Sequence, residues 1–205
     1  VDVSGSRNFG TLSQMKRDMM AEVAATLAFS TIANNDKVGV VFFSNKIEKY
    51  IPAQKGKTHV LHIIRELLSF EPTSKGTDMA QALQYFANAQ KRHCTAFLIS
   101  DFIGTGAVDK PLLIASNRHE VNAIQIYDRR ETELPNIGLV KFHDAESNSN
   151  LWIDTSLATI RNNYAQAWKQ NQDSLEQLFT RTGVKHVSVR TDEDYVKALM
   201  HLFRC

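Results

Sequence analysis

Four apolar runs, separated by segments with helical periodicity, constrain the fold of this chain more than any other feature. They cover residues 38–43, 95–99, 121–127 and 184–189. Between them, apolar side chains recur at helical spacing, as in Met15, Met19, Val23 and Leu27. Buried strands that alternate with helices form a parallel sheet covered on both faces. The sequence therefore predicts one doubly wound α/β domain over residues 1–205, with a mainly parallel central sheet and helices on both faces.

Composition narrows the range of partners. A length of 205 residues suits a single domain with a sizeable core. The net charge of +2 is too small to favour nucleic acid, which would require Lys and Arg to cluster on one face. No apolar run reaches the ~20 residues of a membrane span, and no signal peptide is recognisable. The two cysteines form no disulfide framework, so we expect a cytoplasmic protein.

Residues 138–154 interrupt the alternation. Two short apolar pieces, 138–142 and 151–153, flank Ser147-Asn148-Ser149-Asn150, a composition typical of a turn. This pattern predicts a small β-hairpin insertion, followed by a long helix over about 156–181. Trp152 and Trp168 are expected in the core.

Small oxygen-bearing side chains stand at several predicted strand ends. Asp2, Ser4 and Ser6 follow a presumed first strand, Asp101 follows the run 95–99, and Thr77 is predicted to open a helix at the same edge. In doubly wound sheets, ligands bind outside the carboxyl ends of the strands. Two carboxylates and three hydroxyls are hard oxygen ligands that suit Mg²⁺ or Mn²⁺. We therefore predict a metal site formed by these residues.

Simpler interpretations of the same residues remain open. Thr77 could be a helix cap only, and Asp101 could cap a turn near Gly104. The presumed first strand is also nearly absent, because only Val1 precedes Asp2 and a central strand needs about five residues. We expect either a chain trimmed of an upstream segment or a sheet with a gap at its centre.

Three motifs resemble the metal-ion-dependent adhesion site of von Willebrand factor type A domains. They are Asp2-Val3-Ser4-Gly5-Ser6, Gly76-Thr77-Asp78 and Ser100-Asp101. The stretch 127–138 is similar to a bacterial branch of that superfamily, the domain of unknown function fifty-eight, typically encoded beside MoxR-type AAA+ ATPases. The resemblance implies that a divalent ion is surrounded, in part through water, by Asp2, Ser4, Ser6, Thr77 and Asp101. It also implies an open coordination position that accepts a carboxylate from a partner.

The function expected on this basis is a non-enzymatic, metal-dependent protein–protein interaction module. The resemblance implies that it works with a MoxR-type ATPase, or an acidic client protein, in protein assembly or maturation. Arg129, Arg130, Glu131 and Glu133 could add a polar rim for the partner. The main alternative is a Mg²⁺-dependent phosphate-ester hydrolase that uses the same acids. Its weakness is that the sequence offers no evident general base or nucleophile near the site.

Overall fold

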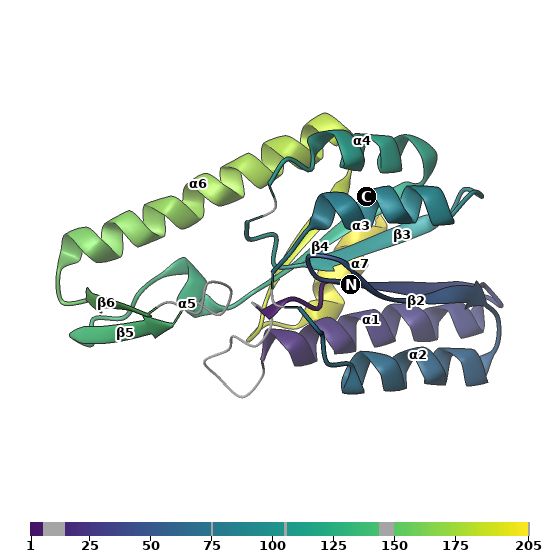
Figure 1. Ribbon diagram of the computed structural model, residues 1–205, viewed down its shortest axis with the longest axis horizontal. Helices are drawn as coiled ribbons and strands as arrows, with labels where there is room; N and C mark the ends of the chain where they lie inside the picture. Colours follow the sequence, from purple (N-terminus) through teal and green to yellow (C-terminus); the bar gives the residue numbers. More distant parts are fainter. Residues whose placement is uncertain (6–14, 75, 105, 144–149, 205) are drawn as a thin grey trace.

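A computed structural model describes residues 1–5, 15–74, 76–104, 106–143 and 150–204 of the chain. Helices and strands alternate through most of it (Figure 1). In chain order the elements are α1 (Lys16–Ala33), β1 (Val38–Phe43), β2 (Ile47–Gln54), α2 (Lys57–Ser69), α3 (Met79–Ala89), β3 (Thr95–Ser100), α4 (Asp109–Arg118), β4 (Glu120–Tyr127), α5 (Arg129–Thr132), β5 (Leu139–His143), β6 (Asn150–Asp154), α6 (Ala158–Thr182), β7 (Lys185–Arg190) and α7 (Tyr195–Arg204).

The central sheet is parallel, in the order β3-β4-β7. Thr95 of β3 pairs with Glu120 of β4, and Asn122 of β4 pairs with Lys185 of β7. Strand β4 alternates between two buried faces: Val121 and Ala123 belong to one hydrophobic cluster, and Ile124 and Ile126 to the other. A strand buried on both faces is characteristic of a parallel sheet wrapped by helices. The predicted α/β class is therefore confirmed.

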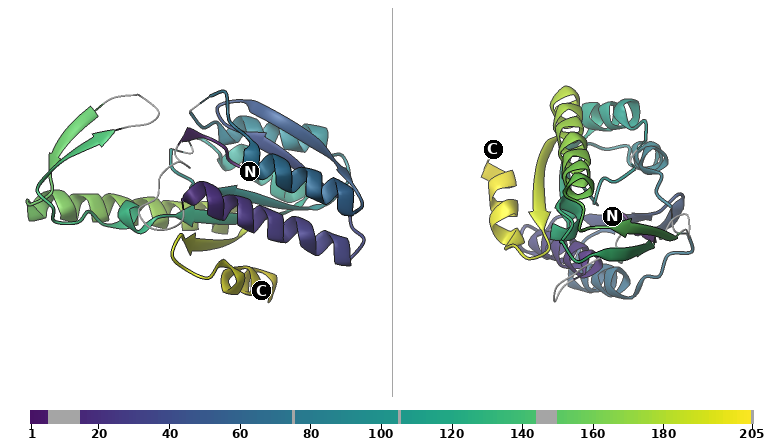
Figure 2. Two further views of the ribbon diagram at one scale, coloured as in Figure 1. Left: turned by 90° about the horizontal axis from the view of Figure 1, so that it is seen from below. Right: turned by 90° about the vertical axis from the view of Figure 1, so that its left-hand side faces the viewer.

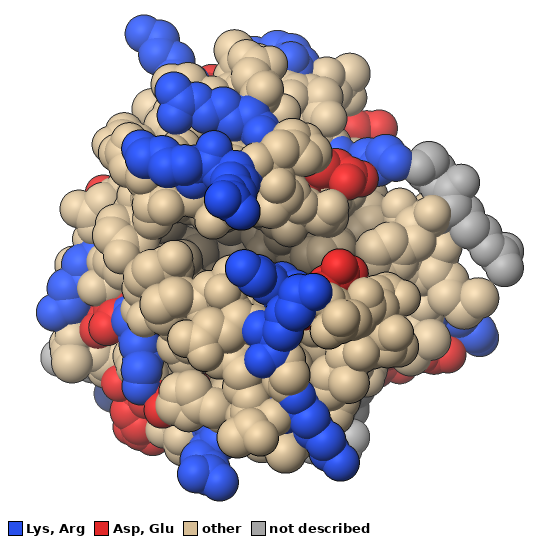
Figure 3. Space-filling view, turned by 90° about the vertical axis from the view of Figure 1, so that its right-hand side faces the viewer, with Lys and Arg blue, Asp and Glu red and all other residues tan. Residues whose placement is uncertain are grey.

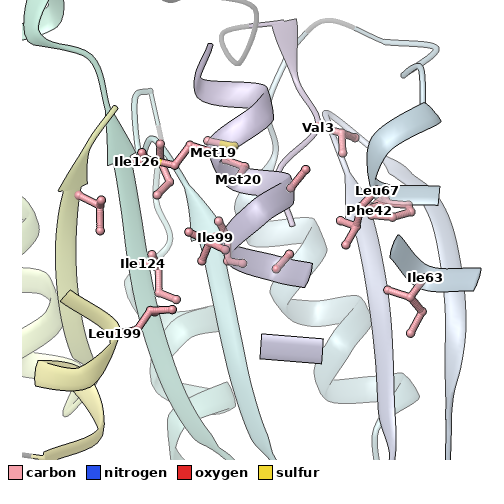
Figure 4. Close-up of a cluster of buried hydrophobic side chains, with 14 of the residues drawn as sticks. Val3, Met19, Met20, Phe42, Ile63, Leu67, Ile99, Ile124, Ile126 and Leu199 are labelled. Atoms are coloured by element: carbon pink, nitrogen blue, oxygen red, sulfur yellow. The ribbon is translucent and has the colours of Figure 1, made fainter. Parts of the chain in front are cut away.

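Two hydrophobic cores lie on the two faces of the sheet. Helices α1, α2 and α7 contribute to the first core, and α3, α4 and α6 to the second. Because the helices of the two cores cover opposite faces, the edge strand β7 lies between α7 and α6 (Figure 2). In the first core, Met19 and Met20 of α1 lie between the parallel strands and the side chains of Val3 and Phe42 (Figure 4). Helix α1 is thereby fixed against the strand ends that carry the polar residues.

Strands β1 and β2 form a separate antiparallel pair, joined to the central sheet through the first residues of the chain. Val3 donates a backbone hydrogen bond to Phe43 of β1, and Asp2 donates one to Ile99 of β3. Beyond this bridge, an apolar cavity of about 500 Å³ separates β1 from β3. Lys37 and Arg92 are among its lining residues. Figure 3 views this end of the molecule, where a hollow lies between groups of Lys and Arg side chains.

The predicted hairpin insertion is present as the antiparallel pair β5–β6, whose connecting residues 144–149 lie outside the described part. Together with the first half of α6 it extends away from the rest of the domain (Figure 1). The prediction that Trp152 belongs to the core is wrong, because its position on this outlying hairpin leaves it 62% exposed. Trp168 is partly buried against the ring of Tyr127.

The starts of α1 and α3 differ in detail from the sequence patterns. Met15 is 50% exposed and forms the N-cap of α1, so the buried stripe of that helix begins at Lys16 instead. Thr77 does not open α3. Asp78 is the N-cap, and its carboxylate accepts a hydrogen bond from the backbone of Gln81 at 2.9 Å. A carboxylate at this position also interacts favourably with the positive end of the helix dipole, which explains why Asp78 takes the role.

Candidate functional site at the carboxyl edge of the sheet

Asp2 lies at the carboxyl edge because backbone hydrogen bonds hold it between two strands. Its N–H donates to Ile99 at 2.9 Å, and its neighbour Val3 donates to Phe43 at 2.8 Å. The Asp2 side chain is buried, as is that of Ser4. The structure therefore places Asp2 and Ser4 at the end of the sheet, where Asp2 lies beside the last residues of β3.

Neutral groups hold the Asp2 carboxylate. Oδ1 accepts the backbone N–H of Ser4 at 2.9 Å, and Oδ2 accepts the hydroxyl of Ser100 at 2.7 Å. The pKa of Asp2 is raised, first by burial and then by the negative charge of Asp101, while the hydrogen bonds from Ser4 and Ser100 oppose the rise. The negative charge of Asp101 thus acts on Asp2, and the two carboxylates repel one another.

Asp101 occupies the turn that directly follows β3. Its Oδ1 accepts the N–H of Ile103 at 3.1 Å, so the alternative in which Asp101 caps a local turn is also realised. The next residue, Phe102, is buried and has a left-handed backbone with φ of 56°. That conformation costs a non-glycine residue roughly 1 kcal/mol, and the packing of Phe102 against Phe179 holds it in place. The strained turn fixes the direction of the Asp101 carboxylate.

A buried ammonium group is paired with Asp101 and shared with Glu131. Nζ of Lys16 donates to Oδ2 of Asp101 at 2.8 Å and to Oε1 of Glu131 at 2.5 Å, and the Lys16 side chain is 0% exposed. Burial alone would lower the pKa of Lys16, but the charges of Asp101 and Glu131 outweigh it and raise the pKa. The raised pKa favours the charged form of Lys16, so its ammonium is part of this edge.

Glu131 is held in position by the short helix α5. Asp128 and Glu131 form a reciprocal capping box, in which each side chain accepts a backbone N–H from the other end of the turn. Burial raises the pKa of Glu131, against the opposing effect of Lys16. Glu131, one of the four residues named for a polar partner-binding rim, turns its side chain inward to the Lys16 ammonium. Arg129 and Glu133 do form an exposed ion pair at 2.8 Å.

The other predicted ligands have different positions. Thr77 is half-buried in the segment before α3, where the N–H of Asp78 donates to the backbone of Ser44 just beyond β1. Within the described residues, Thr77 makes no hydrogen bond with Asp2 or Asp101. Ser6 lies outside the described residues. The structure thus brings Asp2, Ser4 and Asp101 together and places Thr77 on a neighbouring segment.

Sequence reasoning missed Lys16 and the role of Glu131. A signal for Lys16 was present, because it lies three and four positions before Met19 and Met20 and so shares their buried face. Its partners are 85 and 115 residues away in the sequence, and nothing local identifies them. Ser100, which links Asp2 to the turn, belongs to the Ser100-Asp101 motif but was not predicted as a site residue.

The donor atoms at this edge can be compared with what a divalent ion requires. Asp2, Ser4 and Asp101 offer hard oxygen atoms of the type that Mg²⁺ prefers. Among the described residues, however, no group of three or more His, Cys, Asp or Glu is arranged to hold a metal. One oxygen of Asp101 is already committed to Lys16. The chemistry of the donors fits a divalent ion, and an internal cation shares one of its two carboxylates.

The fold and this edge define a doubly wound α/β domain with buried acids at the carboxyl ends of its strands. The chain belongs to the family described as "Protein of unknown function DUF58", whose model matches residues 1–174. It is 30% identical over 200 residues to the uncharacterized protein Rv1480 of Mycobacterium tuberculosis, with 96% of this chain and 62% of that protein covered. The chain therefore spans less than two thirds of the length of this relative.

Two solved structures were found to be similar to this chain, and the first of them supports the fold. An aerotolerance-related membrane protein from Bacteroides fragilis has a TM-score of 0.62 and 13% identity, covering 100% of this chain and 96% of that one. A von Willebrand factor type A protein from Catenulispora acidiphila has a TM-score of 0.43 and 16% identity, covering 62% of this chain and 32% of that one. In the part of this chain that the structure describes, no helix is long and apolar enough to cross a bilayer.

Proposed function

We propose that this domain is a protein-interaction module that docks its partner at the carboxyl edge through a divalent ion, Mg²⁺ or Mn²⁺. The observation that carries the proposal is the convergence of two buried, mutually repelling carboxylates, Asp2 and Asp101, with the hydroxyl groups of Ser4 and Ser100. Mutual repulsion of this kind is relieved by a bound cation.

Asp2, Ser4 and Asp101 would hold the ion, and Thr77 and Ser6 complete the ligand set that the family resemblance implies. The bound ion would supply an electrophilic coordination position for a carboxylate of the partner. Ser100 positions Asp2 by donating to its Oδ2, and the Phe102 turn positions Asp101. The protein's own residues thereby pre-organise the edge before any partner arrives.

We also propose that the domain is not an enzyme. A hydrolase would need a positioned base or nucleophile beside the ion. Among the described residues, no His or Cys contacts either acid, and the Lys16 ammonium is engaged by two carboxylates. We therefore assign these acids to binding. Phosphatase activity that disappears in Asp2→Asn would instead support the hydrolase alternative.

For the partner, the family resemblance supports a MoxR-type AAA+ ATPase or an acidic client protein, met in the cytoplasm during protein assembly or maturation. The test is a binding titration between the full-length protein and the ATPase, with Mg²⁺ or with a chelator. We expect at least a tenfold loss of affinity in chelator and in Asp2→Asn, with Asp36→Asn in an exposed loop as the matched control. Binding that is unchanged by both treatments would exclude an ion-bridged contact.

A further inference from the structure

Lys16 is placed where a lysine is unfavourable unless its charge has a specific role. It is the first residue of α1, and the positive end of the helix dipole repels a cation at that position. The preceding N-cap, Met15, makes no side-chain hydrogen bond to the helix. The side chain is also completely buried, which removes the hydration that an ammonium group normally keeps. Local helix physics therefore does not explain Lys16.

The contacts of Lys16 explain it. Nζ reaches Oδ2 of Asp101 at 2.8 Å and Oε1 of Glu131 at 2.5 Å, and these carboxylates belong to the turn after β3 and to α5. The capping box with Asp128 fixes Glu131, so the ammonium is held between two anchored acids. Asp2, in contrast, accepts its hydrogen bonds from uncharged groups of the described residues, the Ser4 amide and the Ser100 hydroxyl.

We infer that Lys16 is the internal cation of this edge and competes with a divalent ion for Asp101. This inference rests on the proposed function, since it concerns the same site. An ion that takes both Asp2 and Asp101 as ligands must separate Asp101 from the ammonium, and Glu131 keeps the displaced charge paired. The affinity for the ion is therefore set by the strength of the Lys16 contacts as well as by the ligands. When the divalent ion binds, it replaces the Lys16 ammonium as the cation next to Asp101.

The first experiment measures Mn²⁺ binding by isothermal titration calorimetry and by electron paramagnetic resonance of free Mn²⁺. It uses the full-length protein and the double variant Lys16→Met/Glu131→Gln, which removes the ammonium together with the carboxylate that needs it and leaves Asp2 and Asp101 intact. The matched control is Glu131→Gln alone, which keeps Lys16. We expect Mn²⁺ to bind the double variant at least tenfold more tightly than either the wild type or the control.

A second measurement needs no substitution at the site. Amine-reactive labelling of the wild type, read by mass spectrometry, should modify buried Lys16 slowly, and saturating Mg²⁺ should accelerate its modification. Exposed Lys57 should label at the same rate in both conditions. Labelling of Lys16 that Mg²⁺ leaves unchanged would contradict the displacement.

The outcomes separate this inference from the proposed function. If the wild type binds Mn²⁺ as tightly as the double variant, the competition is overturned and ion-bridged docking stands. If no folded variant binds Mn²⁺ at all, both are overturned. Tighter binding by the double variant together with Mg²⁺-dependent labelling of Lys16 supports the exchange of cations.

Discussion

The two carboxylates at the carboxyl edge are both buried, but different forces hold them. Asp101 is paired with a charged group, because Nζ of Lys16 lies 2.8 Å from its Oδ2. Asp2 accepts hydrogen bonds from the Ser4 amide and the Ser100 hydroxyl, and its pKa is raised by burial and by Asp101. The same edge therefore contains one acid that is fixed by an ion pair and one that, among the described residues, has no Lys or Arg side chain paired with it. This asymmetry makes Asp2 the stronger candidate to recruit an external cation.

Removal of the Lys16 ammonium should reduce the free energy of unfolding more than any change on the Asp2 side of the edge. In Lys16→Met, Asp101 and Glu131 lose their common partner inside the protein. Breaking a buried pair from one side typically costs about 3–5 kcal/mol, because the remaining charge is uncompensated. Urea denaturation should show a loss of this size in the free energy of unfolding, whereas Lys57→Met at an exposed position should change it by less than about 0.5 kcal/mol. Equal stability of the two variants would show that the ion pair is not important to the fold.

The ion pair between Lys16 and Asp101 was not predicted from the sequence. The alternation of strands and helices predicted the sheet, and the rule for parallel strands correctly placed Asp2 and Asp101 at one edge. The ion pair was missed because a lysine side chain is normally assigned to the surface. The buried position of Lys16 depends on partners 85 and 115 residues away, which only the tertiary fold brings close.

Two further differences between the sequence-based predictions and the structure concern the start of α3 and the hairpin. Thr77 and Asp78 both carry an oxygen near the start of α3, and sequence alone does not decide which of them is the cap. Asp78 is selected because its N–H is bound to Ser44 while its carboxylate reaches Gln81. The hairpin insertion was predicted over 138–154 from its turn composition, but its projection from the domain beside the first half of α6, which exposes Trp152, was not.

A smaller loss is expected when a neutral donor to Asp2 is removed. The buried hydroxyl of Ser100 donates to Asp2 and accepts the N–H of Phe102 at 3.1 Å. Ser100→Ala leaves both groups without this partner, and an unsatisfied buried polar group costs about 1–3 kcal/mol. The thermal midpoint should fall accordingly, while Ser69→Ala on an exposed helix surface should leave it nearly unchanged. A loss as large as that of Lys16→Met would remove the distinction between the two acids.

Neutralising Asp2 itself should have the smallest effect at neutral pH, and a characteristic dependence on pH. Since the pKa of Asp2 is raised in the folded protein, the folded state binds this proton more tightly than the unfolded chain. The corresponding stability is fully present below the unfolded-chain pKa of about 4 and is lost as the pH rises through the folded-state pKa. Asp2→Asn cannot titrate, so its free energy of unfolding should fall less than that of the wild type over this window.

Urea denaturation at a series of pH values above 4, with Asp36→Asn as the control, measures the difference. Parallel curves for wild type and Asp2→Asn would mean that the Ser4 and Ser100 hydrogen bonds fully offset the burial of Asp2, and the two acids would then be equally compensated.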